Sequence, residues 1–175
     1  MGTPSGSAAS GAQGVPDVRL RPCTADDLPF LYEVYASTRA EELARAPWDA
    51  AQKAAFLRMQ FDAQHRHYQQ HYAGASFDVV LVGGEPAGRL YVARGREEYV
   101  VIDIALLPAL RGGGIGTKLL REVAAEADAQ GARVTLHVER FNPARALYER
   151  LGFAVVADEG VYLRMERATG GAGST

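Results

Sequence analysis

Hydrophobic residues recur along this chain at two different spacings, and the changes between the two mark the expected elements. Val18 to Arg21 alternates apolar and polar side chains, as a half-buried strand does. From Leu28 to Tyr35, and again from about Trp48 to Tyr72, apolar residues recur at helical spacing. Beyond these helices the pattern predicts strands at 77–82, 87–93, 99–107, 133–138, 152–156 and 161–165, with helices at 116–130 and 143–151.

The order of these elements indicates the fold class. One strand and two helices are followed by three strands, and then helix and strand alternate before a final strand pair. This order predicts an α/β protein, an α+β mixed sheet with helices on its faces. The strand at 99–107, the helix at 116–130 and the strand at 133–138 form the expected parallel crossover. Because 99–107 is almost entirely apolar, we expect it to be buried on both faces.

The two ends of the chain differ in composition from its middle. Residues 1–16 and 169–175 are mostly Gly, Ser, Ala and Pro with very few bulky side chains, so we expect flexible tails. Residues 17–168 are long enough for a single domain with a full core, and they contain no internal repeat.

Charge and cysteine content exclude several classes of function. The formal net charge is −2, with 19 basic and 21 acidic side chains, so no global basic field favours nucleic-acid binding. The single cysteine, Cys23, rules out an internal disulfide and a cysteine-based zinc site. No apolar stretch has the length of a membrane-spanning helix, and the N-terminus lacks the pattern of a signal peptide. We therefore expect a cytoplasmic protein that binds neither membrane nor nucleic acid.

A glycine-rich loop at 111–116 lies between the apolar strand and the helix that follows it. Amides at the start of a helix have no partner inside the helix, and the helix dipole is positive there, so such a loop favours anions. Glycines leave room for a phosphate beside these amides and permit positive φ angles. Arg111 adds a fixed positive charge. The alternative is a tight connection without a ligand, which glycines alone would equally explain.

The spacing of the loop excludes two other phosphate-binding motifs. A Walker A loop needs Lys directly after its last glycine, whereas Thr117 separates Gly116 from Lys118. The dinucleotide motif Gly-x-Gly-x-x-Gly fails as well, because its sixth position is Thr117 when counted from Gly112 and Leu119 when counted from Gly114.

Two motifs make the chain resemble the GNAT superfamily of acetyl-CoA-dependent N-acetyltransferases. Arg111-Gly-Gly-Gly114-Ile-Gly116 is similar to the family's Arg/Gln-x-x-Gly-x-Gly/Ala signature, and the strand before it looks like the family strand with its terminal proline. Leu136 to Phe153 resembles the second signature, with Asn142 after a strand and Tyr148 in a short helix. The resemblance implies a GNAT-like fold, a mostly antiparallel mixed sheet of about six to seven strands flanked by about four helices.

The resemblance also implies which residues hold acetyl-CoA, the expected co-substrate. The loop amides would bind the pyrophosphate, and the end of the central strand would pair with the pantetheine arm where the family splays two strands, often with help from a bulge. Asn142 would bond to the same arm. The implied residues are Leu106, Leu107, Arg111, Gly112, Gly113, Gly114, Ile115, Gly116, Thr117, Asn142 and Tyr148.

Acetyl transfer to an amine needs a base for the amine and an acid for the departing thiolate. The resemblance places Tyr148 near the thioester sulfur as the acid, and the alternative is a tyrosine that only packs on its helix. Asp103, the one carboxylate in the apolar strand, is either the general base or a structural hydrogen-bond acceptor. Glu98 and Glu139 are weaker candidates for the base. Cys23 lies far from the motifs, so direct transfer without a covalent enzyme intermediate is expected.

A cluster of histidines, His65, His67 and His71, lies in the second helix with Tyr68 and Tyr72. His67 and His71 are four apart and share a helix face, but no third ligand has suitable spacing, so we expect no metal. The cluster is a polar helix face or, alternatively, part of the lining of an acceptor site. Arg39, Glu41 and Glu42 near the end of the first helix are open to the same two interpretations.

Three functions are consistent with these motifs. The first is transfer of an acetyl or short acyl group from acetyl-CoA to a primary amine, carried by a small molecule or a peptide. The second is a catalytically silent CoA-binding regulatory or structural module. The third is a nucleotide-binding protein that uses the same loop. The identity of the amine and a homodimeric state are left open by the sequence.

Overall fold

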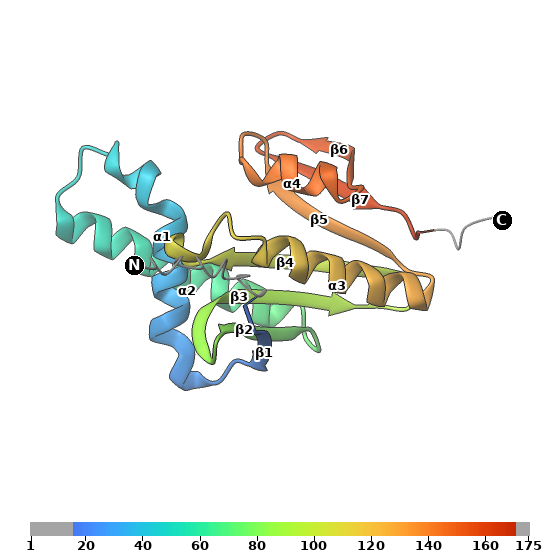
Figure 1. The fold of residues 1–175 in the computed structure, drawn as a ribbon. Coiled ribbons are helices and arrows are strands. Elements are labelled where there is room, and N and C mark those ends of the chain that lie inside the picture. The colour runs from blue at the N-terminus through green and yellow to red at the C-terminus, as the bar shows by residue number, and fades with distance from the viewer. Residues whose placement is uncertain (1–15, 171–175) are drawn as a thin grey trace, which may run out of the picture.

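The computed structural model describes residues 16–170, which form one sheet with helices on both faces (Figure 1). The seven strands lie in the order β1-β2-β3-β4-β5-β7-β6. Neighbouring strands are antiparallel except β4 and β5, which are parallel and joined through α3. This confirms the predicted mixed, mostly antiparallel sheet with its single crossover. The predicted tails fall mainly on residues 1–15 and 171–175, which lie outside the described residues.

The observed elements lie close to the predicted ones. The strands are β1 Val18–Pro22, β2 Ser76–Val82, β3 Glu85–Arg94, β4 Glu98–Leu106, β5 Arg133–Glu139, β6 Ala154–Glu159 and β7 Tyr162–Arg167. The helices are α1 Leu28–Ala44, α2 Ala50–His71, α3 Ile115–Gln130 and α4 Ala144–Arg150, with short 3-10 turns η1 Ala25–Asp27 and η2 Pro108–Leu110. Asp49 caps α2, since its side chain accepts from the amide of Gln52.

Two apolar clusters stabilise the two faces of the sheet. The larger one packs the apolar stripe of α3, including Leu119 and Val123, against strands β3, β4, β5 and β7. The smaller one lies between α1 and α2 and centres on Leu31, Tyr35 and Phe61. Tyr35 and Phe61 are in tilted contact at 5.9 Å between ring centroids. Helix α1 also contacts β3 and β4, so the helix pair covers the face of the sheet opposite α3.

Strand β4 differs from the prediction in its C-terminal half. Its N-terminal part alternates between half-buried and buried residues, but Ile102 to Ala105 are all only half-buried. The register with β3 shifts here, because Tyr91 pairs with Asp103 and Val92 with Val101, which leaves Ile102 as an extra residue. The prediction of burial on both faces is therefore wrong for this half, since a β-bulge and the loss of a neighbouring strand open it.

Strand β4 loses its neighbour β5 partway along its length. The two strands pair only from Glu98 with Arg133 to Val101 with Leu136. Beyond Leu136, β5 continues to pair with β7 as far as Glu139 with Tyr162, so it diverges from β4. Figure 1 shows β5 leaving β4 and carrying α4, β6 and β7 with it. The edge of β4 from Ile102 onward thus has no strand partner on this side.

Among the described residues, no helix has both the length and the hydropathy that crossing a bilayer requires.

Candidate active site

The glycine loop after β4 has the conformation that only glycine adopts easily. Gly112 and Gly114 have φ angles of 76° and 85°, in the left-handed region. Gly114 is the N-cap of α3, and its carbonyl accepts the first helical hydrogen bond from Lys118. In the described residues, no turn, cap or side chain bonds to the amides of Gly112 to Thr117. The loop therefore presents unpaired N–H groups at a helix start, as an anion site requires.

Space beside the loop is open. A methyl group added at Gly112, Gly113 or Gly114 meets no atom within 4 Å, and one added at Gly116 meets only the side chain of Leu147 at 4.0 Å. Packing within the protein therefore does not demand glycine at Gly113 or Gly116, whose φ angles are not positive. This cradle of free amides has room for a diphosphate, and a merely tight connection would not explain glycine at Gly113 and Gly116.

Arg111 is held beside the loop by two hydrogen bonds. Its Nε donates to the carbonyl of Leu106 at 2.9 Å, and its Nη2 donates to Ser37 Oγ in α1 at 3.0 Å. The guanidinium thus ties the loop to the end of β4 and to α1. It also occupies the Leu106 carbonyl, so the unpaired polar groups on the open edge of β4 lie before this residue.

A cavity of about 230 Å³ lies where β4 and β5 diverge. Residues of α1 and α2 contribute to its wall, and so do α4 and the strands β3, β4, β5 and β7. The cavity therefore reaches residues carried on both faces of the sheet. Its polar lining includes Thr38, Arg39, Gln64, Tyr68, Arg89, Asp103, His137, Glu139, Asn142, Tyr148 and Tyr162.

Tyr148 reaches this cavity from α4 and is 8% exposed. Its ring is in edge contact with Phe153, and its carbonyl accepts from the Phe153 amide at 3.0 Å, so the Gly-Phe end of the motif fixes the tyrosine. Burial, together with the negative charge of Asp103, raises the pKa of Tyr148 to about 12. The phenol therefore keeps its proton at neutral pH.

Asp103 is part of a buried polar network. Arg89 Nη2 donates to Asp103 Oδ2 at 2.8 Å, and the hydroxyl of Tyr68 donates to the same oxygen at 3.2 Å. Arg89 is only 3% exposed and also donates to Gln64 at 3.0 Å. A carboxylate that compensates a buried guanidinium is needed in its charged form. This arrangement favours the structural alternative for Asp103 over the general base.

Asn142 lies in the wall of the same cavity, as its place in the motif predicts. Its Oδ1 accepts from the amide of Ala144 at 2.9 Å, which stabilises the first turn of α4. Its side-chain NH₂ bonds to no protein group in the described residues and remains available to a ligand.

Several cavity residues were missed by sequence reasoning, above all Arg89 and His137. Arg89 is the one charged residue in the buried stretch of β3 from Ala87 to Val92. It lies two residues before Tyr91, which pairs with the equally unusual Asp103 of β4. Matching lone charges in neighbouring strands is a signal that could have found the pair. His137 sits in the middle of β5 between two buried residues, Leu136 and Val138, and is itself exposed.

The histidine cluster of α2 does not line the cavity. His65 stacks on Phe61 at 5.8 Å, and His67 lies 4.0 Å from His71 between ring centroids. Of the residues that the sequence groups there, only Tyr68 reaches the cavity. Within residues 16–170, no group of three or more His, Cys, Asp or Glu side chains is arranged to hold a metal ion.

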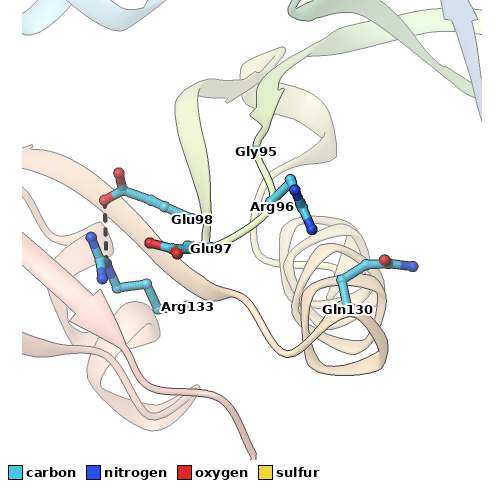
Figure 2. A pocket seen from close by; sticks show the side chains of 6 residues that line it. All are labelled: Gly95, Arg96, Glu97, Glu98, Gln130 and Arg133. Carbon is cyan, nitrogen blue, oxygen red and sulfur yellow. Dashed lines mark ion pairs between the residues drawn. The ribbon is translucent and has the colours of Figure 1, made fainter.

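A wider hollow of about 790 Å³ lies at the opposite end of β4 (Figure 2). It is lined by Gly95, Arg96, Glu97, Glu98, Gln130 and Arg133. Figure 2 shows Arg133 facing Glu98, with an ion pair of 3.6 Å between Nε and Oε1. None of the residues in the two motifs reaches this hollow, so we place the candidate site at the smaller cavity.

The profile of the acetyltransferase (GNAT) family matches residues 32–153, which include most of α1, all of α2 to α4, the glycine loop and every residue of the cavity wall except Tyr162. The chain belongs to this family. N-alpha-acetyltransferase RimI of Mycobacterium tuberculosis is 40% identical to it over 102 residues, which are 56% of this chain. The match spans 61% of that relative's length.

Solved structures share the fold. The PaiA N-acetyltransferase of Thermoplasma acidophilum, in complex with coenzyme A, has a TM-score of 0.66 at 19% identity and covers 87% of this chain and 99% of its own. The ribosomal-protein-S18-alanine N-acetyltransferase of Escherichia coli has a TM-score of 0.60 at 20% identity, with 91% and 98% covered. The GNAT-like fold that the motifs imply is confirmed.

Proposed function

We propose that this protein transfers an acetyl or short acyl group from acetyl-CoA to a primary amine, in one direct step with both substrates bound. The observation that carries the proposal is the open edge of β4, which connects a loop of free amides to a cavity containing a buried phenol. Family membership supports the same conclusion.

In this proposal, the amides from Gly112 to Thr117 hold the pyrophosphate of coenzyme A, helped by the positive end of the α3 dipole. The unpaired edge of β4 binds the pantetheine arm as a neighbouring strand would, from Ile102 towards Leu106 and Leu107. At its end the Leu106 carbonyl is already bound by Arg111 and the Leu107 amide by the carbonyl of Ala87, so these two residues border the arm without pairing through those groups. Asn142 donates its free NH₂ group to the same arm. The thioester would then lie in the gap between β4 and β5.

Tyr148 is proposed as the acid that protonates the departing thiolate. A buried phenol in the cavity wall is fully protonated at neutral pH and can donate when the sulfur becomes negative. No covalent enzyme intermediate is needed. Cys23 is half-buried, and burial first of all raises the pKa of its thiol to about 11, which makes it a poor nucleophile. It also lies outside the cavity wall.

The acceptor is proposed to be the α-amino group of a peptide or a small-molecule amine. The name of the Mycobacterium tuberculosis relative favours an α-amine first. An α-amine has a pKa of about 8, well below that of a lysine side chain, so it releases its proton more readily near neutral pH. The charges in the cavity are balanced, with Arg89 beside Asp103 and Arg39 beside Glu139, and so do not select a strongly charged acceptor.

A silent CoA-binding module is the competing proposal, and one assay separates the two. Acetyl-CoA is incubated with a panel of short peptides with free N-termini, lysine peptides with blocked N-termini, and small amines, and released thiol is measured. Thiol release that depends on one acceptor class supports the enzyme. Calorimetric binding of coenzyme A without acceptor-dependent thiol release supports the module, and no binding at millimolar concentration contradicts both.

A further inference from the structure

The proposed transfer needs a group that removes a proton from the acceptor ammonium. Asp103 is a poor choice because Arg89 and Tyr68 already bond to one of its oxygens. Glu139 at the cavity wall is paired with Arg39 at 3.2 Å. A proton acceptor must therefore be sought among the remaining side chains of the cavity.

His137 is that side chain. It belongs to β5 and is among the residues that line the same cavity as Tyr148 and Asn142. Its neighbours Leu136 and Val138 are buried on the α3 side, so the alternation of the strand directs His137 to the opposite face. Its side chain is 45% exposed, which leaves it in contact with solvent as well. Histidine is the side chain that most readily gains and loses a proton near neutral pH.

A carboxylate stands beside His137. Glu159 in β6 places Oε2 at 3.2 Å from Nε2 of His137, and it makes no other ion pair in the described residues. The two residues are brought together by the β6–β7 hairpin, in which Glu159 pairs with Tyr162 while His137 of β5 pairs with Arg164. A carboxylate beside an imidazole nitrogen can fix the orientation of the ring.

The other charged residues near the imidazole are already held in ion pairs. Arg164 interacts with Glu98 at 3.4 Å, and so lies toward the closed end of β5. The remaining groups that face the cavity from the packed elements are Tyr35 and Arg39 of α1, Tyr68 of α2, Arg89 of β3, Asp103 of β4, Glu139 of β5, Tyr148 of α4 and Tyr162 of β7.

We infer that His137 is the general base of the acyl transfer, with Glu159 as the positioning residue that holds its imidazole. The inference rests on the proposed function and deepens it. The neutral imidazole takes one proton from the acceptor ammonium, directly or through a water molecule. The freed amine then forms a bond to the thioester carbon, and the carbon–sulfur bond breaks.

The proton balance of this step closes without another reactant. Tyr148 gives its proton to the departing thiolate and recovers one from the nitrogen that becomes the amide. The proton on His137 passes to solvent through its exposed edge. The net change is one acyl group moved, one thiol formed and one proton released.

The test is the pH dependence of kcat/KM in His137→Asn, with the acceptor that the wild-type enzyme uses. At pH 7 we expect a loss of about 10²-fold, in the usual range for removal of a general base. The loss should shrink as pH rises through the pKa of the acceptor, because the amine then arrives already deprotonated. Affinity for coenzyme A, measured by calorimetry, should not change.

Controls separate a base from a residue that only packs. His71→Asn, an exposed histidine of α2 outside the cavity wall, should behave as wild type. Glu159→Gln should lower kcat/KM about tenfold, an effect typical of a lost orienting charge, and Glu159→Asp should recover part of it. A His137→Asn enzyme with unchanged activity at pH 7, or with an equal deficit at every pH, would overturn the assignment.

Failure of the inference and failure of the proposed function give different results. If the wild-type protein transfers acyl groups but His137→Asn does so equally well, only the base assignment is lost. If the wild-type protein binds coenzyme A and acylates no amine, the transferase proposal itself is contradicted, and the base with it.

Discussion

The two halves of β4 share one strand but have opposite surroundings. From Glu98 to Val101 the strand is paired on both sides, and Glu98 contacts Thr135 at 3.0 Å, Arg133 at 3.6 Å and Arg164 at 3.4 Å. From Ile102 onward it has lost β5 and borders the cavity. One half therefore contributes to stability, and the other offers one unpaired edge beside the cavity that Tyr148 of α4 also lines. This contrast separates residues that hold the fold from residues that are proposed to act on a ligand.

The largest expected effect is at the open half. Tyr148→Phe should lower kcat about 10²-fold, because the thiolate loses its acid, while the affinity for coenzyme A and the Tm change little. Steady-state kinetics with calorimetry and thermal unfolding check this. Equal turnover by the variant would remove Tyr148 from the acid role.

Tyr148 also has a pH signature. Its pKa is raised to about 12, so the folded protein keeps the phenol protonated until well above the usual tyrosine value of about 10. Activity that depends on this proton should therefore not decline between about pH 8 and pH 10.5. A decline in the wild-type kcat centred near the ordinary tyrosine pKa, and absent in Tyr148→Phe, would show that burial does not raise the pKa of this phenol.

Gly116→Ala should produce opposite effects on binding and stability. In the first turn of α3, alanine gains about 0.5–1 kcal/mol over glycine, and its methyl group meets only Leu147 at 4.0 Å. The same methyl group crowds a diphosphate at the amides, so we expect Kd for coenzyme A to rise about tenfold. Calorimetry and thermal unfolding measure the two effects. Gly114→Val is a poorer probe because its φ of 85° makes any branched side chain strained.

The smallest effect is expected at the closed half. Glu98→Gln should lower the free energy of unfolding by about 1 kcal/mol, since the ion pairs with Arg133 and Arg164 are partly exposed while the hydrogen bond from Thr135 can persist. Urea unfolding measures this change, and kcat/KM should stay at the wild-type value. A large loss of activity would show that the two halves are not separate.

Much of the fold could be predicted from sequence because its signals are local. Helical spacing in Leu119 and Val123, the turn glycines and the apolar run of β4 each depend on a few neighbouring residues. The apolar run at 99–107 does not reveal the bulge at Ile102, because apolar side chains suit a regular strand and a bulged strand equally well. The bulge is fixed by pairing with β3 across the sheet.

The sequence predicts the part of the candidate site that lies in the two motifs, but not the residues that other strands contribute to it. The glycine loop, Asn142 and Tyr148 stand at fixed spacings, whereas Arg89, His137 and Glu159 come from three strands whose contacts depend on register. Asp103 shows the same limit. Its position in the sequence is consistent with a general base and with a structural hydrogen-bond acceptor. The contact with Arg89, 14 residues earlier in the chain, favours the structural role.

The ion pair between Arg89 and Asp103 makes the two positions interdependent. Removal of the carboxylate alone leaves the Arg89 guanidinium buried without its counter-charge; the residue is 3% exposed, and its Nε already lacks a hydrogen-bond partner. Breaking a buried ion pair in this way typically lowers the free energy of unfolding by about 3–5 kcal/mol. An inactive Asp103→Asn protein would thus be as readily explained by a weakened scaffold as by missing chemistry. Substitution of both residues together by apolar side chains is the change that tells these explanations apart.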